Sequence, residues 1–256
     1  MTAGARSGVL GRVAEVFRSY QGEGLLLGRR QVFVRLAGCT VGCRYCDTEW
    51  AFETPADVAV PGEEAGGERV PNPMTAEQLV ALVEAADPGG DDPVSLTGGE
   101  PLEQPDFVEA LLDALEAAPR PRAVMLETAA LHGEALARVA PRVRWVAADL
   151  KLPTATGRAA CLDEHAAALG AGALADTETF FKLIVDGDTG DDELRRAAAL
   201  LAEHRPTAPV FLQPVTPLGG APALPRARLD VLVDLLAAAG LDVRVVPQVH
   251  KVLRVR

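Results

Sequence analysis

Aromatic residues are scarce in this sequence: Phe, Trp and Tyr make up 4% of the 256 residues. A hydrophobic core must therefore be built mainly from Leu, Val and Ala, and at 48% hydrophobic residues the chain can bury one such core. No run of about 18 consecutive apolar residues occurs, which argues against a membrane-spanning helix. Residues 1–11 lack the apolar segment of a secretory signal peptide, so we expect a cytoplasmic protein.

Basic residues are outnumbered, with 25 Lys and Arg against 36 Asp and Glu and a formal net charge of -11. No basic face stands out, so nucleic acid is not an expected partner. Only four cysteines are present and three of them are clustered, which does not fit the disulfide framework of a secreted protein. A reducing compartment fits this cysteine content.

The three clustered cysteines are the most informative feature. Three residues separate Cys39 from Cys43, and two separate Cys43 from Cys46, so one short loop can direct three thiolates at one object. A structural zinc ion would be expected to have four protein ligands, whereas an iron–sulfur cube held by three cysteines leaves one iron open for a small molecule. A zinc-stabilised binding module is the alternative from a non-enzyme class. Cys161 stands alone far downstream, and we expect it to be structural.

Apolar strands and amphipathic helices alternate along the chain about six times. Thr75 and Gln78 form the pattern of a capping box, which predicts a helix from there to about residue 86. The alternation predicts an α/β fold of (β/α)6 type with parallel strands and right-handed crossovers, in a sheet that is curved or partly closed into a barrel and formed by a single domain over 1–256. A Pro-, Gly- and Glu-rich stretch at about 55–73 is expected to be a flexible insertion. The main strands are expected at residues 13–17, 31–36, 94–96, 124–128, 143–151, 180–185, 210–214 and 243–247.

Polar residues follow the expected strands. Cys39, Thr97, Glu127, Lys151 and Gln213 each fall at or just past the end of one. Because the carboxyl ends of parallel strands share one face, these residues should meet above a single opening. A second polar position, Arg35, interrupts an apolar strand. It is expected either in a structural ion pair or as a bidentate anion-binding group.

The cysteine spacing, with an aromatic residue, Tyr45, before the third cysteine, resembles the radical S-adenosylmethionine (SAM) superfamily. Residues 97–101, Thr-Gly-Gly-Glu-Pro, look like that superfamily's methionine-amino motif. More narrowly, the chain resembles the 7-carboxy-7-deazaguanine synthase family. The segments that carry this resemblance are residues 19–24, 33–39, 46–48, 127–128, 151, 212–214 and 250–251.

This resemblance implies a homodimeric carbon–nitrogen lyase of queuosine and 7-deazapurine biosynthesis with a partial barrel fold. Its substrate would be 6-carboxy-5,6,7,8-tetrahydropterin, converted to 7-carboxy-7-deazaguanine with loss of ammonia. The implied cofactors are a [4Fe–4S] cluster, SAM and Mg²⁺, with flavodoxin or ferredoxin as electron donor. The radical chemistry would come from the reduced cluster and SAM, and the protein would position them.

The resemblance also implies roles for individual residues. Cys39, Cys43 and Cys46 would hold the cluster, and Thr48 would bind Mg²⁺. The residues implied for SAM are Tyr45, Asp47, Gly99, Glu100, Glu127, Asp149, Lys151 and Gln213. The residues implied for the substrate are Tyr20, Gln21, Gly22, Glu23, Arg35, Thr97, His250 and the carboxylate of Arg256.

Two departures from the family pattern stand out. Ala129-Ala130 replaces an Asn-Gly pair, and Asp149-Leu150 replaces a Ser-Pro pair before Lys151. The Asp-Leu-Lys version is also similar to glycyl-radical-enzyme activases, which act on a protein partner. An activase is therefore the alternative function, and it would require neither residues 19–24, Arg35 nor a Mg²⁺ site.

Overall fold

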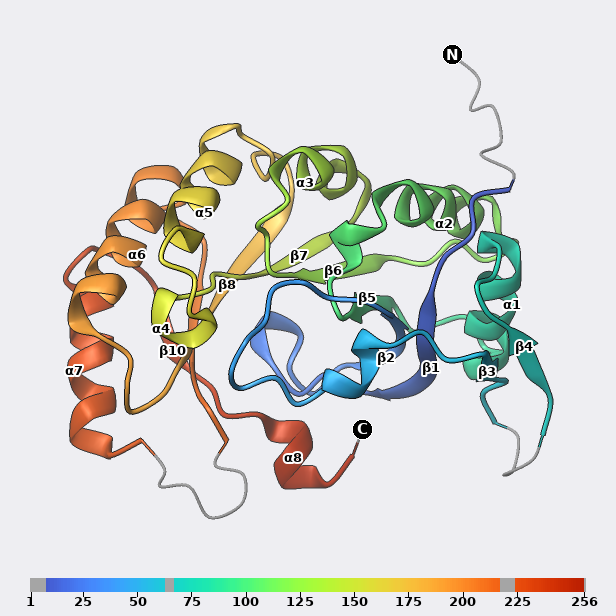
Figure 1. Ribbon diagram of the computed structural model, residues 1–256, viewed down its shortest axis with the longest axis horizontal. Coiled ribbons are helices and arrows are strands. Elements are labelled where there is room, and N and C mark those ends of the chain that lie inside the picture. The colour runs from blue at the N-terminus through green and yellow to red at the C-terminus, as the bar shows by residue number, and fades with distance from the viewer. Residues whose placement is uncertain (1–7, 63–66, 217–223, 256) are drawn as a thin grey trace.

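A computed structural model describes residues 8–62, 67–216 and 224–255, and its main feature is one eight-stranded sheet (Figure 1). The strand order is β1-β2-β5-β6-β7-β8-β9-β10, with all strands from β2 onwards parallel and β1 antiparallel to β2. The described sheet does not close, because β1 and β10 are its two edges. The predicted partial barrel is thus confirmed. The bounds are β1 Val13–Tyr20, β2 Arg30–Leu36, β5 Val94–Gly98, β6 Val124–Thr128, β7 Trp145–Asp149, β8 Glu178–Val185, β9 Val210–Pro214 and β10 Val243–Val245.

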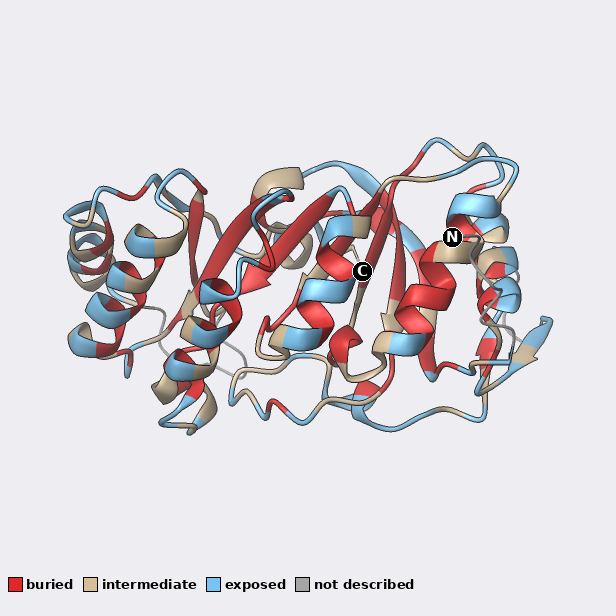
Figure 2. Cartoon of the chain, turned by 90° about the horizontal axis from the view of Figure 1, so that it is seen from above, coloured by how far each residue is buried: buried red, intermediate tan, exposed pale blue. Residues whose placement is uncertain are grey.

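The helices form an arc around the outside of the curved sheet, and α8 lies on the inner side close to the C-terminus (Figure 1). Buried residues face the sheet and exposed ones face outward, as the colouring of Figure 2 shows. The predicted capping box is present, since Thr75 Oγ1 accepts from Gln78 N at 3.3 Å and Gln78 Oε1 accepts from Thr75 N at 2.9 Å. The helices are α1 Ala76–Ala86, α2 Pro105–Ala117, α3 Gly133–Val139, α4 Pro153–Thr156, α5 Cys161–Gly170, α6 Asp191–His204, α7 Arg226–Ala237 and α8 Val249–Leu253. Short 3-10 turns occur at η1 Gly24–Leu26, η2 Glu49–Phe52, η3 Pro101–Glu103 and η4 Ala140–Arg142.

The sheet separates two hydrophobic cores. The large outer core lies between strands and helices, whereas a small inner core fills the base of the barrel. The buried members of the inner core are Met125, Trp145, Ala147, Phe180 and Phe211. Burial of each large side chain of this kind contributes roughly 1.5–3 kcal/mol to the stability of the fold. Because these side chains are almost fully buried, the inner core also closes the base of the barrel to water.

On β6, β7, β8 and β9, a side chain that faces the barrel interior is apolar, and the next interior side chain, two residues further on, is polar. Since successive residues alternate between the faces of a strand, positions two apart share a face. Met125 is followed by Glu127, Ala147 by Asp149, Phe180 by Lys182 and Phe211 by Gln213. A ring of polar groups therefore lies directly above the inner core.

The stretch expected to be a flexible insertion contains two short strands, β3 Asp57–Ala59 and β4 Arg69–Pro71, which pair antiparallel. The Asn72 side chain fastens it to β1, because its Oδ1 accepts from Val13 N at 3.2 Å and its Nδ2 donates to Val13 O at 2.7 Å. The stretch therefore includes regular structure, and the expected flexibility of the insertion stays a prediction. No helix in the described part of the chain is long and apolar enough to cross a membrane.

Candidate active site

A cavity of about 1240 Å³ lies at the carboxyl ends of the parallel strands. Every site residue predicted from the sequence lines it, except Arg256, which lies outside the described residues. The sequence therefore predicted the location of the cavity correctly, because the strand ends converge as parallel topology requires.

The cysteine loop is held against the glycine motif by backbone contacts. Gly99 N donates to Leu36 O at 3.0 Å, and Glu100 N donates to Gly38 O at 2.9 Å. A Cβ atom added to Gly99 would lie 1.9 Å from Gly38 O. Only glycine permits this approach, so the glycine motif fixes the position of the loop that carries Cys39.

The three clustered cysteines are free, half-buried and line the cavity. Burial raises the pKa of the Cys39 and Cys43 thiols, and Lys151 opposes this effect at Cys43. Among the described residues, no group of three His, Cys, Asp or Glu side chains converges on a single metal ion. Three free thiols that line one cavity match the donor set of an iron–sulfur cluster with one open position, whereas the structural zinc ion considered from the sequence would be expected to have four protein ligands.

Glu100 is bound by the protein itself. Its buried carboxylate accepts hydrogen bonds from Thr128 Oγ1 at 2.6 Å, Ala129 N at 2.7 Å and Leu102 N at 2.9 Å. Burial raises the pKa of this carboxyl. The visible role of Glu100 is to join the loops after β5 and β6, and its predicted contact with SAM stays a prediction.

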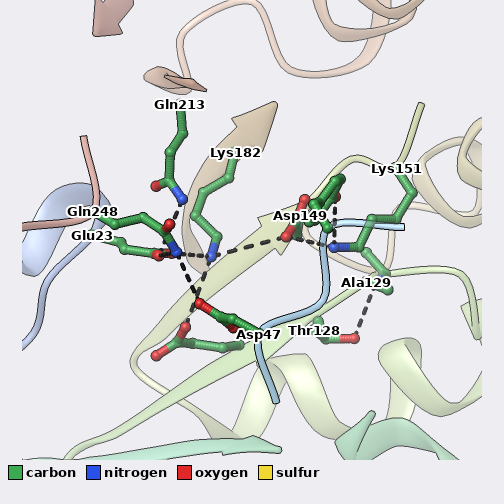
Figure 3. Close-up of polar contacts among 12 residues, drawn as sticks. Glu23, Asp47, Thr128, Ala129, Asp149, Lys151, Lys182, Gln213 and Gln248 are labelled. Atoms are coloured by element: carbon green, nitrogen blue, oxygen red, sulfur yellow. Dashed lines mark hydrogen bonds and ion pairs between the residues drawn. The ribbon is translucent and has the colours of Figure 1, made fainter. Parts of the chain in front are cut away.

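A network of charged side chains crosses the cavity (Figure 3), which we call the site network. It consists of Glu23, Glu127, Asp149, Lys151 and Lys182. Lys182 Nζ lies 2.7 Å from Glu23 Oε2, 3.9 Å from Glu127 Oε2 and 4.0 Å from Asp149 Oδ2. Lys151 Nζ lies 2.7 Å from the same Asp149 oxygen. The network therefore connects residues predicted for the substrate with residues predicted for SAM.

Lys182 was missed from the sequence. The available signal was a lysine within the apolar run of residues 180–185, two positions after an interior Phe180. In the sheet, Lys182 pairs in register with Asp149 of β7, which brings the two side chains to the same level. An interior lysine beside an interior aspartate follows from this register, which only the assembled sheet reveals.

Lys151 is positioned from both its side chain and its backbone. Its Nζ lies 3.2 Å from Tyr45 Oη, and 5.2 Å from the centre of the Tyr45 ring. Its backbone N donates to His165 Nε2 at 2.8 Å, and its backbone O accepts from Cys161 Sγ at 3.1 Å. Burial opposes the charge on Lys151, but Asp149 outweighs it and raises the Lys151 pKa. Cys161 is thus structural, as expected, whereas the part played by His165 had no signal in the sequence.

The chain end closes one side of the cavity. Val249 N donates to Gly22 O at 3.0 Å, and a Cβ atom on Gly22 would lie 2.2 Å from His250 Nδ1. Gly22 therefore permits the close approach of α8. Lys251 Nζ lies 2.7 Å from Asp47 Oδ2, and Gln248 Nε2 donates to Glu23 Oε1 at 3.1 Å. Gln248 and Lys251 are further lining residues that were not predicted as site residues.

Arg35 lines the cavity and forms an ion pair, so the structural ion pair considered from the sequence is present, while anion binding by Arg35 stays a prediction. Its Nε lies 3.0 Å from Glu15 Oε1, and its guanidinium is 5.9 Å from the centre of the Trp50 ring. Thr48 is close to the third cysteine, with 3.7 Å between Cys46 Sγ and Thr48 Oγ1.

Two buried acceptors in the cavity have no hydrogen-bond partner among the residues that the structure describes: Asp149 Oδ1 and Gln213 Oε1. Buried polar atoms without partners are costly and uncommon in folded proteins. Both need donors, and the hydroxyl and ammonium groups of SAM could supply them. The site therefore fits the cofactors that the cysteine and glycine motifs imply.

Comparisons with known proteins agree with this geometry. Residues 33–161 match the family model of the radical SAM superfamily. The chain is 37% identical over 246 residues to the 7-carboxy-7-deazaguanine synthase of Geobacter sulfurreducens, covering 93% of this chain and 94% of the relative. It is 34% identical to the enzyme of that name from Methanopyrus kandleri, over 94% and 92% of the two chains.

The fold resembles the crystal structure of QueE from Escherichia coli, with a TM-score of 0.60, 22% identity and coverage of 94% and 96%. The whole-length relatives give no support to the alternative of a glycyl-radical-enzyme activase. The chain therefore belongs to the radical SAM superfamily and, within it, to the 7-carboxy-7-deazaguanine synthase family.

Proposed function

We propose that this protein converts 6-carboxy-5,6,7,8-tetrahydropterin to 7-carboxy-7-deazaguanine with loss of ammonia, in queuosine or 7-deazapurine biosynthesis. The observation that carries the proposal is that the three free cysteines line the same cavity as Glu23, Arg35 and His250. This arrangement suits a small polar substrate held beside a cluster. Family membership supports the same reaction.

Cys39, Cys43 and Cys46 would hold a [4Fe–4S] cluster whose open iron binds SAM. The chemistry that the cluster and SAM would supply is radical removal of hydrogen from the substrate. The protein residues proposed to bind and orient SAM are Tyr45, Asp47, Gly99, Glu100, Glu127, Asp149, Lys151 and Gln213. Of these, Asp149 and Gln213 offer the unpartnered acceptors, and a polar cavity closed at its base by the inner core limits access of water.

The substrate carries a carboxylate and a flat ring with N–H donors. Arg35 would bind the carboxylate, and Gln21, Glu23 and His250 would bind the ring, with Tyr20, Gly22 and Thr97 beside them. Burial favours the neutral form of Glu23, but Lys182 outweighs it and lowers the Glu23 pKa to about 2. Glu23 is therefore an ionised acceptor at neutral pH, and an ionised carboxylate forms stronger hydrogen bonds with N–H donors than a neutral carboxyl does.

Further parts of the proposal follow from the family. Thr48 would bind a Mg²⁺ that also contacts the substrate, as suits a hard ion with few protein ligands. The carboxylate of Arg256 would contact the pterin. The protein would act as a cytoplasmic homodimer of single-domain chains, with flavodoxin or ferredoxin as electron donor.

Anaerobic reconstitution tests the proposal directly. We expect iron and sulfide near four each per chain, and formation of 7-carboxy-7-deazaguanine when the carboxy-tetrahydropterin, SAM, reductant and Mg²⁺ are supplied. One zinc ion per chain, or reconstituted protein that cleaves SAM without consuming the pterin, would overturn it. Omitting Mg²⁺ tests the role of Thr48, and a C-terminal extension that raises KM for the pterin would support the role of Arg256.

A further inference from the structure

Lys182 is a buried cation that the reaction described above does not use. Its residue is 6% exposed, and it extends into the barrel from the middle of β8, above Phe180 of the inner core. An ammonium group at such a place is costly unless it is paired. Lys182 must therefore stabilise specific partners, and the distances identify the main one.

Only one of the three surrounding carboxylates is within hydrogen-bond distance of Lys182. Glu23 Oε2 lies at 2.7 Å, whereas the nearest oxygens of Glu127 and Asp149 lie at 3.9 and 4.0 Å. These two have closer partners of their own. Glu127 Oε1 accepts from Gln21 Nε2 at 2.9 Å, and Asp149 Oδ2 accepts from Lys151 Nζ at 2.7 Å. Lys182 therefore acts principally on Glu23.

Glu23 depends on Lys182 for its charge balance. Its second oxygen, Oε1, accepts from Gln213 Nε2 and from Gln248 Nε2, both at 3.1 Å, and these amides are neutral. Within residues 8–62, 67–216 and 224–255, no other Lys or Arg forms an ion pair with Glu23. Without Lys182, the largely buried carboxylate, whose side chain is 13% exposed, would keep only weaker support from two neutral amides and the nearby His250.

The bonds at Glu23 leave acceptor capacity for a ligand. A carboxylate has about four lone-pair sites, and three donors from the protein occupy three of them. We propose that Lys182 is a positioning residue for substrate binding, which holds the Glu23 carboxylate in place for the N–H donors of the substrate ring. This inference rests on the proposed function, and it assigns Lys182 to recognition of the pterin through Glu23.

A double-mutant cycle on the reconstituted enzyme tests this role. Lys182→Met removes the charge with little change in length, and Glu23→Gln removes the acceptor charge. Each variant should raise KM for the carboxy-tetrahydropterin by about 10- to 100-fold, the range for a hydrogen bond to a charged group. KM for SAM should change much less. The double variant should show the KM of Glu23→Gln alone, because Lys182 acts through Glu23.

A matched control separates recognition from general stability. Arg122→Met removes another buried cation, which pairs with Asp87 at 2.8 Å outside the cavity. It should lower Tm without changing KM for the pterin. If Lys182→Met fails to fold, the double variant can still be measured, since it lacks the unpaired charge of Glu23. Its KM is then compared with that of Glu23→Gln.

Three results would overturn the inference. These are an unchanged KM in Lys182→Met, single effects that multiply in the double variant, or a rise confined to KM for SAM. These results bear on the inference when the wild-type enzyme itself forms the deazaguanine product. A wild-type enzyme that forms none refutes the proposed function instead, so the two failures are distinguishable.

Discussion

The two ends of the barrel both contain buried charges, but they are organised differently. At the amino ends of the strands lies what we call the basal network, formed by Arg18, Arg30, Asp87, Asp92 and Arg122. Arg122 Nη1 lies 2.8 Å from Asp87 Oδ2, Arg18 Nη2 lies 2.8 Å from Asp87 Oδ1, and Arg18 Nε lies 2.6 Å from Asp92 Oδ2. Here three cations surround two carboxylates, and both carboxylates are bound from several sides.

The site network at the opposite end has the reverse balance, with two lysines among Glu23, Glu127 and Asp149. In the described part of the chain, the only buried side-chain atoms without partners are Gln31 Nε2, Asp149 Oδ1 and Gln213 Oε1. The last two line the cavity and none belongs to the basal network. Buried charge alone therefore does not distinguish a binding site from a structural ion cluster. The acceptors left without donors make the distinction.

The largest effect should come from the cysteine loop, which belongs to the site end. Cys43→Ala should abolish activity, because a cluster cannot be held by two of its three thiolates. Iron content and visible absorbance of the anaerobically reconstituted protein provide the measurement. Cys161→Ala, which removes a contact with the Lys151 backbone and a small part of the outer core, should retain its iron. Full iron content in Cys43→Ala would show that the cluster is held elsewhere.

A substitution at the other end should affect stability and leave catalysis intact. Arg122→Met leaves Asp87 partly uncompensated, and both side chains are nearly inaccessible at 4% and 2% exposure. We expect the free energy of unfolding to fall by about 3–5 kcal/mol. Urea denaturation gives this value, and kcat/KM measured below Tm should match the wild type. A changed KM would mean that the two ends are coupled.

Substitution of His165 tests whether a residue at the site end of the barrel also contributes to the stability of the fold. Burial lowers its pKa to about 4, below the 6.5 of an unfolded chain, since Nε2 must stay unprotonated to accept from Lys151 N. The contribution of neutral His165 to the free energy of unfolding is therefore complete above pH 6.5, and it is lost as the pH falls from 6.5 towards 4. The loss should approach about 3 kcal/mol. Denaturation of the wild type and of His165→Gln at pH 7 and pH 4.5 measures how much of the loss of stability at low pH is due to His165. An equal loss in the two proteins would contradict the prediction.

The smallest effect should come from the outermost member of the basal network. Arg30 Nε lies 2.8 Å from Asp92 Oδ2, but the Arg30 side chain is 49% exposed. Water competes for such a pair, so Arg30→Gln should cost less than about 1 kcal/mol. Thermal denaturation beside Arg122→Met gives the contrast within one network. A loss of stability as large as that of Arg122→Met would show that the strength of these ion pairs does not depend on their exposure to solvent.

The sequence was sufficient for the fold and for the location of the cavity. Compact apolar runs predicted the strands, and the rule for parallel strand ends brought Cys39, Glu127, Lys151 and Gln213 to one face. Lys182 could not be found in this way, because its position in the interior depends on which face of β8 turns inward. That choice is made by packing of Phe180 in the inner core.

Other contacts depend on chain segments that meet only after folding. Gln248 reaches Glu23 across more than 200 positions of sequence, and His165 contacts the Lys151 backbone from a separate helix. The strands β3 and β4 were hidden in a stretch rich in Pro, Gly and Glu. Their attachment to β1 through Asn72 is a tertiary contact that local composition does not reveal.

The docking of α8 against Gly22 has a consequence for biosynthesis of the enzyme. Residues 248–251 complete a wall of the cavity by contacting Gly22, Glu23 and Asp47, which are translated more than 200 codons earlier. Because these late residues follow β10 in the chain, every described strand of the sheet is synthesised before this wall is complete.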